Sequence, residues 1–348
     1  MAVPGVIAST FILGGIVNTF YSNQAWEGGE DFGWPTEAGI MLGVILSATD
    51  PVAVVALLKD LGVKQELAIG IEAESLFNDG TALVFFQVLF DLIKVPAAVA
   101  PTANTIVYGF LWKAVGGALW GVLFGVAEWF WLQRNFNSPV IEITITLTTA
   151  YLAFFSAEVI GCSGVLAVVA LGLFMGKEGK VSISPEVGHF LEEFWEMLAF
   201  FGNTVVFVIA GLAMSYRLGL FDGALWGAYD LGVVCLLYVV STIVRGCIVC
   251  LVWAFEARLG NKVDWRDAVV TTWGGLRGAV GLALALMVFN ETETICERVR
   301  VRILFHTSGI VLLTVIVNSL SMKQIIGLLG INKEGEERKL IQEQALKK

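Results

Sequence analysis

One apolar stretch of the chain carries an unusual concentration of side chains that could hold an ion. Polar or ionisable residues occupy five of eight consecutive positions: Glu72, Glu74, Ser75, Asn78 and Asp79. Glu74 and Asn78 are four residues apart, as are Ser75 and Asp79, so in a helix the two pairs form adjoining stripes of one face. Ser75 or Asn78 alone would be typical of hydrogen bonding between helices. The full set exceeds what packing requires and predicts an ion site.

The preceding apolar stretch, 38–59, is interrupted near its middle by Thr49, Asp50 and Pro51. Proline removes a backbone donor and clashes with the preceding helical turn, so we expect the helix to break here. Pro51 at the first position of a new half-helix, with Asp50 as its N-cap, is a favourable restart. Because freed backbone groups are tolerated in lipid only where they line a cavity or meet partners, we expect this break to do one or the other.

Counter-charges within apolar segments are scarce. Arg245 lies in the middle of one such segment, and a buried guanidinium needs a carboxylate to offset its desolvation, for which we expect Glu74. Arg277 directly follows a Gly-Gly-Leu sequence that loosens the second-last segment. Paired interrupted segments are typical of transporters built from inverted repeats. We therefore expect the two broken helices to cross.

Three further polar residues have competing interpretations. Glu158 fits a supporting role behind the ion site and a position near the external end of its segment equally well. Asn203 and Thr204 could join the cavity, although hydrogen bonds between helices are favoured for both.

The elements that position these residues follow from composition. Of the 348 residues, 57% are apolar and 15% charged, and the mean hydropathy is +0.77, whereas a soluble domain carries about a quarter charged residues. Blocks of about 20 apolar residues match the thickness of a hydrocarbon core. Charged side chains at that depth are costly, so each is a functional candidate. The net charge of −9 without a basic patch argues against nucleic acid as a partner.

Hydropathy predicts an all-α polytopic membrane protein with about ten transmembrane helices, although 139–177 could be divided differently. The ten segments are 3–20, 38–59, 67–93, 103–132, 139–160, 163–177, 189–215, 226–257, 265–290 and 301–329. Loops on one side of the membrane hold more Lys and Arg than loops on the other, and this bias places the richer side in the cytoplasm. Arg302 is counted as a loop residue of the poorer side. We expect one membrane domain, 1–330, and a charged cytoplasmic tail, 331–348.

Two other function classes fit less well. Asp50 and Asp79 on neighbouring segments would suit an intramembrane aspartyl protease, but its Gly-x-Gly-Asp signature is absent. A cation channel typically needs a repeated filter loop, and we find none.

His189 and His306 lie far apart in the sequence with no second His or Cys at ligand spacing. The C-x-x-C pair of Cys247 and Cys250 lies inside an apolar segment, which favours buried thiols over a redox site. We expect no enzymatic activity and no cofactor besides transported ions.

The polar stretches resemble those of the cation/proton antiporter family, in particular the electroneutral Na⁺/H⁺ exchangers of the NhaP and NHE type. The matching stretches are SATDPVAVVALLKDLG at 47–62, EAESLFNDGTALV at 72–84, YLAFFSAEVIGCSGVLAVVALGLFMG at 151–176 and GGLRGAVGLALAL at 274–286. The sequence FWEM followed by Asn-Thr is similar to plant plasma-membrane salt-tolerance exchangers and to sperm-type exchangers. The resemblance covers essentially residues 1–330.

The resemblance implies roles for named residues. It places the exchanged cation, Na⁺, and the proton at Asp79, with four residues around them: Asn78, Ser75, Thr49 and Asp50. It implies that Glu74 and Arg245 form a structural ion pair and that Arg277 balances local charge. Several animal exchangers have a glutamate where this chain has Asn203, so we assign that position no charge.

The resemblance also implies thirteen helices in two inverted repeats, a homodimer in the full-length protein and a plasma-membrane location. Ten segments, the first similar to the fourth helix of the family, lead us to expect that the first three helices are missing. The alternative to active antiport is then a transport-inactive fragment or a regulatory form of an exchanger.

Exchange requires one acid that binds either a cation or a proton. Asp79, with Asn78 rather than a second Asp beside it, offers one exchangeable charge, so one-for-one exchange by alternating access is expected, serving to regulate intracellular pH and sodium. Oxygen ligands suit Na⁺ or Li⁺, and these residues do not distinguish Na⁺ from K⁺.

Overall fold

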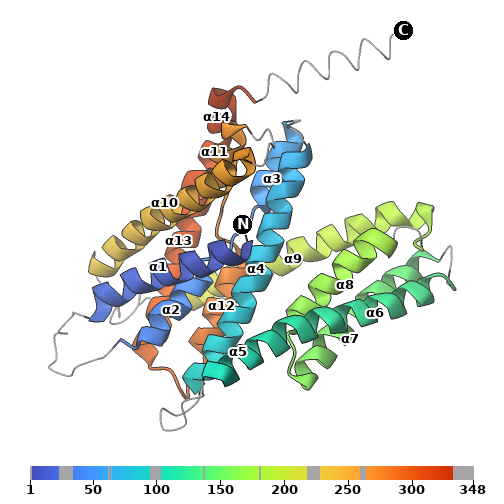
Figure 1. Cartoon of the computed structure of the whole chain (residues 1–348), viewed down its shortest axis with the longest axis horizontal. Helices are drawn as coiled ribbons and strands as arrows, with labels where there is room; N and C mark the ends of the chain where they lie inside the picture. Colours follow the sequence, from blue (N-terminus) through green and yellow to red (C-terminus); the bar gives the residue numbers. More distant parts are fainter. Residues whose placement is uncertain are drawn as a thin grey trace. The chain divides into compact units, whose positions relative to one another are not determined.

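A computed structural model describes residues 2–22, 34–61, 63, 65–94, 103–135, 138–179, 182–217, 228–258 and 264–331. Within these ranges the regular structure is helical and no strand is found. The chain divides into two compact units (Figure 1). The first unit comprises residues 1–82 and 206–348, and the second comprises residues 83–205.

The first unit contains two interrupted segments among continuous helices. Its helices in chain order are α1 (Ala2–Ser22), α2 (Thr36–Ile45), α3 (Val52–Asp60), the first part of α4 (Gln65–Lys94), the last part of α9 (Pro185–Arg217), α10 (Ala228–Arg258), α11 (Trp265–Trp273), α12 (Ala279–Asn290), α13 (Glu297–Leu313), the π-helical turn η4 (Thr314–Ser319) and α14 (Leu320–Leu329). α1 packs on α2, and α12 packs on α13.

The second unit is built around three mutually packed helices. It holds the rest of α4, α5 (Ala103–Leu111), the π-helical turn η2 (Trp112–Gly116), α6 (Gly117–Leu132), α7 (Pro139–Ile160), α8 (Gly164–Glu178) and most of α9. α6, α7 and α8 contact one another. Gly121 lets α6 approach the backbone of α8 at Ala167, where a Cβ would have no room.

The helices match the ten predicted segments in position. Seven helices in the described part of the chain are long and apolar enough to cross a membrane. The other three predicted segments are α8, with 15 residues, and the segments 38–59 and 265–290, each divided into two short helices. The number of membrane crossings stays a prediction, and the predicted tail at 331–348 lies outside the described residues except for its first position.

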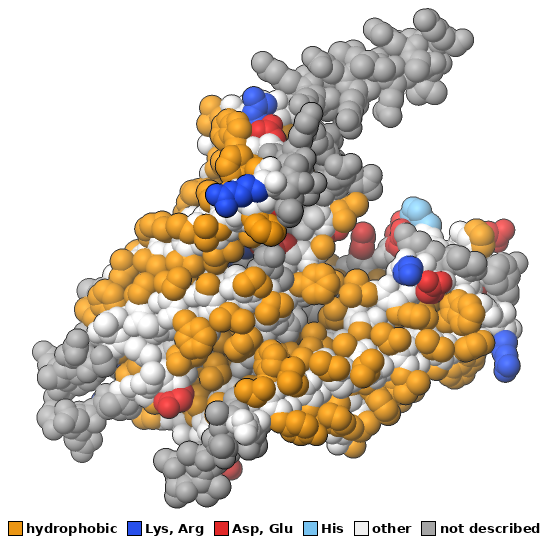
Figure 2. Space-filling model, viewed as in Figure 1, with side chains coloured by type: hydrophobic (Ala, Val, Ile, Leu, Met, Phe, Trp, Pro, Cys, Tyr) orange, Lys and Arg blue, Asp and Glu red, His pale blue; other side chains and the backbone are white. Residues whose placement is uncertain are grey.

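The surface agrees with a membrane environment. Hydrophobic side chains cover most of the described surface in Figure 2, with few charged groups among them. Large apolar side chains such as Val159 and Leu328 are each 87% exposed. Extended exposed apolar surface is not stable in water, so the chain is a multi-pass membrane protein.

A hydrophobic core in the first unit fixes the short helices next to the interruptions. Val54 and Leu58 of α3, Ile71 of α4, Val270 of α11 and Met322 of α14 are buried together in it. Leu276, from the interruption between α11 and α12, belongs to the same core. The short helices are therefore held by side-chain packing, which compensates for their small number of backbone hydrogen bonds.

Candidate functional site

The interruption between α2 and α3, residues 46–51, is the first break. α2 ends at Ile45, and α3 begins at Val52, one residue after the predicted restart at Pro51. Asp50 Oδ1 accepts a hydrogen bond from the Val52 amide at 3.0 Å, which is the capping interaction expected of Asp50. The carboxylate also lies where the N-terminal dipole of α3 favours negative charge.

Three polar side chains of α4 converge on Thr49 in the first break. The Thr49 amide donates to Asp79 Oδ1 at 3.2 Å, and the Ser75 hydroxyl donates to the Thr49 carbonyl oxygen. Asn78 Nδ2 donates to the Thr49 hydroxyl at 3.1 Å. The predicted polar face of α4 thus satisfies the amide, the carbonyl and the hydroxyl of a single residue. The first break does meet polar partners, as expected from its position in an apolar segment.

Arg245 of α10 approaches Glu74 of α4, as the scarcity of counter-charges suggested. Arg245 Nη2 lies 3.4 Å from Glu74 Oε1 and 3.5 Å from Oε2, and the two side chains are only 11% and 13% exposed. Arg245 Nε also donates to the Thr271 carbonyl of α11 at 3.1 Å. One guanidinium therefore connects three helices.

The interruption between α11 and α12, residues 274–278, is the second break, and it meets the first. The Asp50 amide donates to the Leu276 carbonyl at 2.8 Å. Arg277 is buried, and its Nη1 donates to the Ala48 carbonyl at 3.0 Å. Gly278 lies so close to Asp50 that a Cβ at this position would overlap the carboxylate-bearing side chain. The expected crossing of the two broken helices is present.

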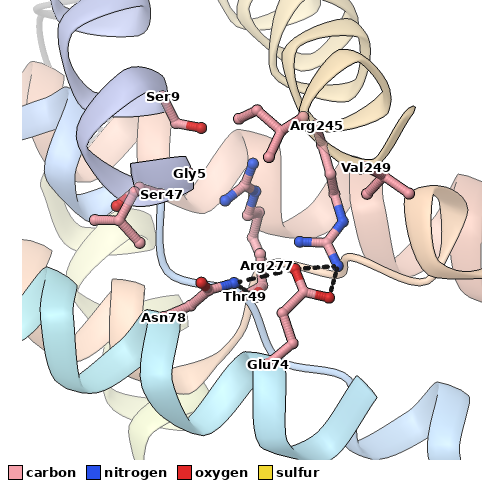
Figure 3. A pocket seen from close by; sticks show the side chains of 11 residues that line it. Gly5, Ser9, Ser47, Thr49, Glu74, Asn78, Arg245, Val249 and Arg277 are labelled. Carbon is pink, nitrogen blue, oxygen red and sulfur yellow. Dashed lines mark hydrogen bonds and ion pairs between the residues drawn. The ribbon is translucent and has the colours of Figure 1, made fainter. Parts of the chain in front are cut away.

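A small cavity lies beside this crossing. Its volume is about 20 Å³, enough for about one water molecule. Its polar walls come from Ser9, Ser47, Thr49, Glu74, Asn78, Arg245 and Arg277, which Figure 3 shows gathered around it with the guanidinium of Arg245 directed at Glu74. Asp79 is not among the lining residues and reaches Thr49 through its own hydrogen bond.

The charges at the crossing do not cancel when all of them are ionised. Glu74, Asp50 and Asp79 supply three carboxylates, and Arg245 and Arg277 supply two guanidinium groups. Glu74 is matched by Arg245, and the charged groups that act on Asp79 are Asp50 and Arg277. One negative charge is left uncompensated, which a single monovalent cation or a single proton would neutralise.

The remaining candidates lie elsewhere in the chain. Glu158 belongs to the second unit, where Oε1 accepts from the Gly164 amide at the start of α8 at 2.8 Å. Asn203 and Thr204 also belong to that unit, and the Thr204 hydroxyl bonds to the Phe200 carbonyl of its own helix. A role for Glu158 or Asn203 near the ion site stays a prediction. Glu72 is exposed, whereas Ser75 and Asn78 are buried and Glu74 and Asp79 are partly buried.

Two polar residues that sequence reasoning missed contact the second break. Thr314 and Asn318 lie in η4 and are each 2% exposed. Thr314 Oγ1 accepts from the Arg277 amide at 3.2 Å, and Asn318 Nδ2 donates to the Trp273 carbonyl at 3.1 Å. Their spacing of four within an apolar segment, directly after a predicted broken helix, is the signal that could have indicated them.

A second buried charge network joins α1, α10 and α13. The Tyr21 hydroxyl donates to Asp230 Oδ1 at 2.6 Å and lies 2.8 Å from His306 Nε2. Arg302 Nε lies 3.4 Å from the same Asp230 oxygen. Counting Arg302 as a loop charge was wrong, because α13 begins at Glu297, before the predicted segment at 301–329, and buries the guanidinium against Asp230.

Comparisons with known proteins agree with this geometry. Residues 1–327 match the model of a family described as "Sodium/hydrogen exchanger, transmembrane". Sodium/hydrogen exchanger 7 of Arabidopsis thaliana is 36% identical over 335 residues, 95% of this chain and 28% of that protein. The Na⁺/H⁺ antiporter ApNhaP of Aphanothece halophytica is 32% identical over 350 residues, 99% of this chain and 61% of that protein.

The fold is likewise that of a solved antiporter. The structure of the sodium proton antiporter MjNhaP1 from Methanocaldococcus jannaschii matches with a TM-score of 0.69 at 20% identity, covering 94% of this chain and 79% of that one. The chain spans between 28% and 61% of the length of the first three curated relatives. Because the family model covers nearly the whole chain, the expected resemblance is confirmed, and the protein belongs to the sodium/hydrogen exchanger family.

Proposed function

We propose that this chain exchanges Na⁺ for H⁺ across a membrane and that Asp79 is the group that carries either ion. Membership in a transporter family supports antiport rather than enzymatic activity. The observation that carries the assignment of Asp79 is its position: its carboxylate accepts a hydrogen bond from the Thr49 amide within the first helix break. Discontinuous helices with exposed backbone groups are typical of ion sites in transporters with inverted repeats.

Na⁺ is a hard cation and prefers oxygen ligands. The Ser75 hydroxyl and the Thr49 carbonyl oxygen bond to each other, and the Thr49 amide donates to the Asp79 carboxylate, so we propose these two oxygens as further cation ligands. Asn78 supplies an amide bonded to the Thr49 hydroxyl and adds no charge. The same donors would accept Li⁺ or K⁺, and Na⁺ is proposed because the relatives are named as Na⁺/H⁺ antiporters.

Protonation of Asp79 removes the negative charge that holds the cation, so proton and cation compete for one carboxylate. With Glu74 paired to Arg245 and Asp50 capping α3, Asp79 is the exchangeable acid at the crossing. One exchangeable charge supports a one-for-one, electroneutral stoichiometry. In this scheme Arg277 balances the carboxylates, while Glu74 and Arg245 hold α4 against α10.

Further properties rest on family membership. We propose that the site opens alternately to the two sides of the membrane, that the exchange contributes to the regulation of intracellular pH and sodium, and that the location is the plasma membrane. A homodimer is proposed for the full-length protein. No cofactor is proposed, since the transported ions are the substrates.

The test uses the 348-residue chain in detergent and in proteoliposomes. Asp79→Asn removes the exchangeable charge and keeps the size of the side chain, so ²²Na⁺ binding and Na⁺-driven proton flux should both be abolished. Asp91→Asn is the matched control, because Asp91 lies on the same helix, is 61% exposed and pairs with Lys113, and an ion pair with an exposed member contributes little. It should retain both activities.

The outcomes separate the site from the transport. Na⁺ binding and flux that survive Asp79→Asn would overturn the assignment of Asp79. Na⁺ binding by the unsubstituted chain without flux would support the ion site and would identify a transport-inactive form of the exchanger.

A further inference from the structure

A π-helical turn interrupts the long helical segment that runs from α13 to α14. The turn η4 covers Thr314–Ser319 and is followed directly by α14. π-Helical turns are rare and occur frequently at functional sites. In this protein η4 lies against the second break, where the backbone between α11 and α12 has left the helical hydrogen-bonding pattern.

Asn318 holds the α11 side of the second break. Its Nδ2 donates to the carbonyl of Trp273, the last residue of α11, at 3.1 Å. Its Oδ1 accepts from the hydroxyl of Tyr238 on α10 at 2.6 Å. Because both the nitrogen and the oxygen of the Asn318 amide are hydrogen-bonded, its orientation is fixed. The Trp273 carbonyl, which has no partner within its own helix end, is thereby satisfied.

Thr314 holds the α12 side of the same break. Its Oγ1 accepts from the Arg277 amide at 3.2 Å and donates to the Val311 carbonyl at 2.9 Å. α12 begins two residues after Arg277 without a side-chain cap. One π-helical turn therefore supplies partners for backbone groups on both sides of the second break.

The second break in turn positions the first. The Leu276 carbonyl accepts from the Asp50 amide, and Arg277 Nη1 donates to the Ala48 carbonyl. Thr49, which lies between these two bonded residues, is the one whose amide donates to Asp79. A continuous series of hydrogen bonds thus runs from η4 through the second break to the Asp79 carboxylate.

We propose that Thr314 and Asn318 are positioning residues for the ion site. They fix the second break, which through Leu276 and Arg277 holds residues 48–50 where Thr49 meets Asp79. Neither side chain is a cation ligand in this scheme. The inference rests on the proposed function for its link to Na⁺, while its structural step, that η4 holds the first break through the second, is measurable without any ion.

The primary variant is Thr314→Val, which keeps the branched shape and removes the acceptor for the Arg277 amide. An unsatisfied buried donor is costly, so the Na⁺ affinity in ²²Na⁺ binding should fall by about tenfold. Amide hydrogen exchange at residues 48–50, measured without Na⁺, should become faster. Thr314→Ser retains the hydroxyl and should bind Na⁺ within about twofold of the unsubstituted chain.

Thr307→Val, on α13 of the same long helical segment, is the matched control. Thr307 is 1% exposed, and its hydroxyl has no hydrogen-bond partner among the described residues. The substitution is chemically identical but removes no bond to the break. Both the Na⁺ affinity and the exchange at residues 48–50 should stay within about twofold of the unsubstituted chain. Should Thr314→Val fail to fold, Tyr238→Phe is the milder variant, because it removes only the donor to Asn318.

Each result has a defined meaning. Faster exchange at residues 48–50 together with weaker Na⁺ binding supports the inference, and so does rescue by Thr314→Ser. Unchanged exchange at 48–50 in Thr314→Val would overturn it, as would an equal effect of Thr307→Val. Faster exchange with unchanged Na⁺ affinity would overturn the link to the ion site. If Na⁺ binding survives Asp79→Asn, the proposed function fails, and hydrogen exchange alone then decides whether η4 positions the first break.

Discussion

The two helix breaks of the first unit pose the same chemical problem and have different solutions. At the first break, Thr49 is held by Asp79, Ser75 and Asn78, so one of its partners is an ionisable carboxylate, the one that we propose binds either a cation or a proton. At the second break, Trp273 and Arg277 are held by Asn318 and Thr314, which do not ionise. If Asp79 is the exchangeable acid that we propose, the first break responds to protons and cations, and the second break, whose partners do not ionise, supports it.

The breaks also differ in the charge that they carry. Asp50 on the first break caps α3, where the helix dipole favours a carboxylate. Arg277 on the second break reaches the Ala48 carbonyl, beyond the C-terminal end of α2, where the dipole favours a cation. The carboxylate of the first break therefore lies at the N-terminal end of α3, and the guanidinium of the second break lies near the C-terminal end of α2. Both charges have the sign that the helix dipole favours, so the contact between the breaks is electrostatically favourable.

The largest loss of stability is expected from substituting Arg245, which contacts α4 beside the first break and α11 beside the second. Arg245→Ala leaves Glu74 as a buried unpaired charge and removes the bond to Thr271. The free energy of unfolding should fall by about 3–5 kcal/mol, measured by thermal or denaturant unfolding in detergent.

Arg266→Ala is the control for Arg245→Ala, because Arg266 pairs with Asp264 where both side chains are about 40% exposed. Arg266→Ala should lower the free energy of unfolding by about 1 kcal/mol or less. Equal stability of the two variants would show that Arg245 contributes no more than a surface ion pair.

Gly278→Ala tests the contact between the breaks directly. The added Cβ would overlap Asp50, and overpacking of this kind costs about 1–3 kcal/mol. Because Asp50 is displaced, the Na⁺ affinity should fall as well. Gly15→Ala, on α1 where a Cβ meets nothing within 4 Å, should change stability by about 1 kcal/mol at most and in the favourable direction. Normal Na⁺ binding by Gly278→Ala would argue against close contact of the breaks as a requirement.

Ser75→Ala should have the smallest effect of these substitutions. It removes one neutral donor to the Thr49 carbonyl and keeps Asp79, and one hydrogen bond contributes about 1 kcal/mol, or about fivefold in Na⁺ affinity. Thr81→Val removes a hydroxyl that bonds only to the Phe77 carbonyl of the same helix and should leave binding unchanged. A total loss of binding in Ser75→Ala would indicate that Ser75 is a principal cation ligand.

The first break and its partners could be predicted from the sequence because local rules specify them. Proline within an apolar segment requires an interruption, and residues four apart on α4 must share a face. Glu74 and Arg245 could be paired because buried charges are scarce and need compensation. The interruption at Arg277 followed from glycines in an apolar segment.

The supports of the second break could not be predicted in the same way. The spacing of four between Thr314 and Asn318 places them on one face of an apolar helix, but this pattern alone does not show which backbone groups they bond, and a π-helical turn has no local sequence signature. The ion pair of Arg302 with Asp230 was missed because both residues lie near the ends of predicted segments, where charged side chains are usually solvated. Burial of such groups depends on tertiary packing rather than on local pattern.

The most direct test of the central claim compares amide hydrogen exchange at residues 46–51 and 274–278 in the presence of Na⁺ and of choline at the same pH. We predict that Na⁺ slows exchange at the first break, leaves the second unchanged, and has no effect on either in Asp79→Asn. Equal slowing at both breaks, or Na⁺-dependent slowing that persists in Asp79→Asn, would contradict a responsive first break supported by a fixed second one.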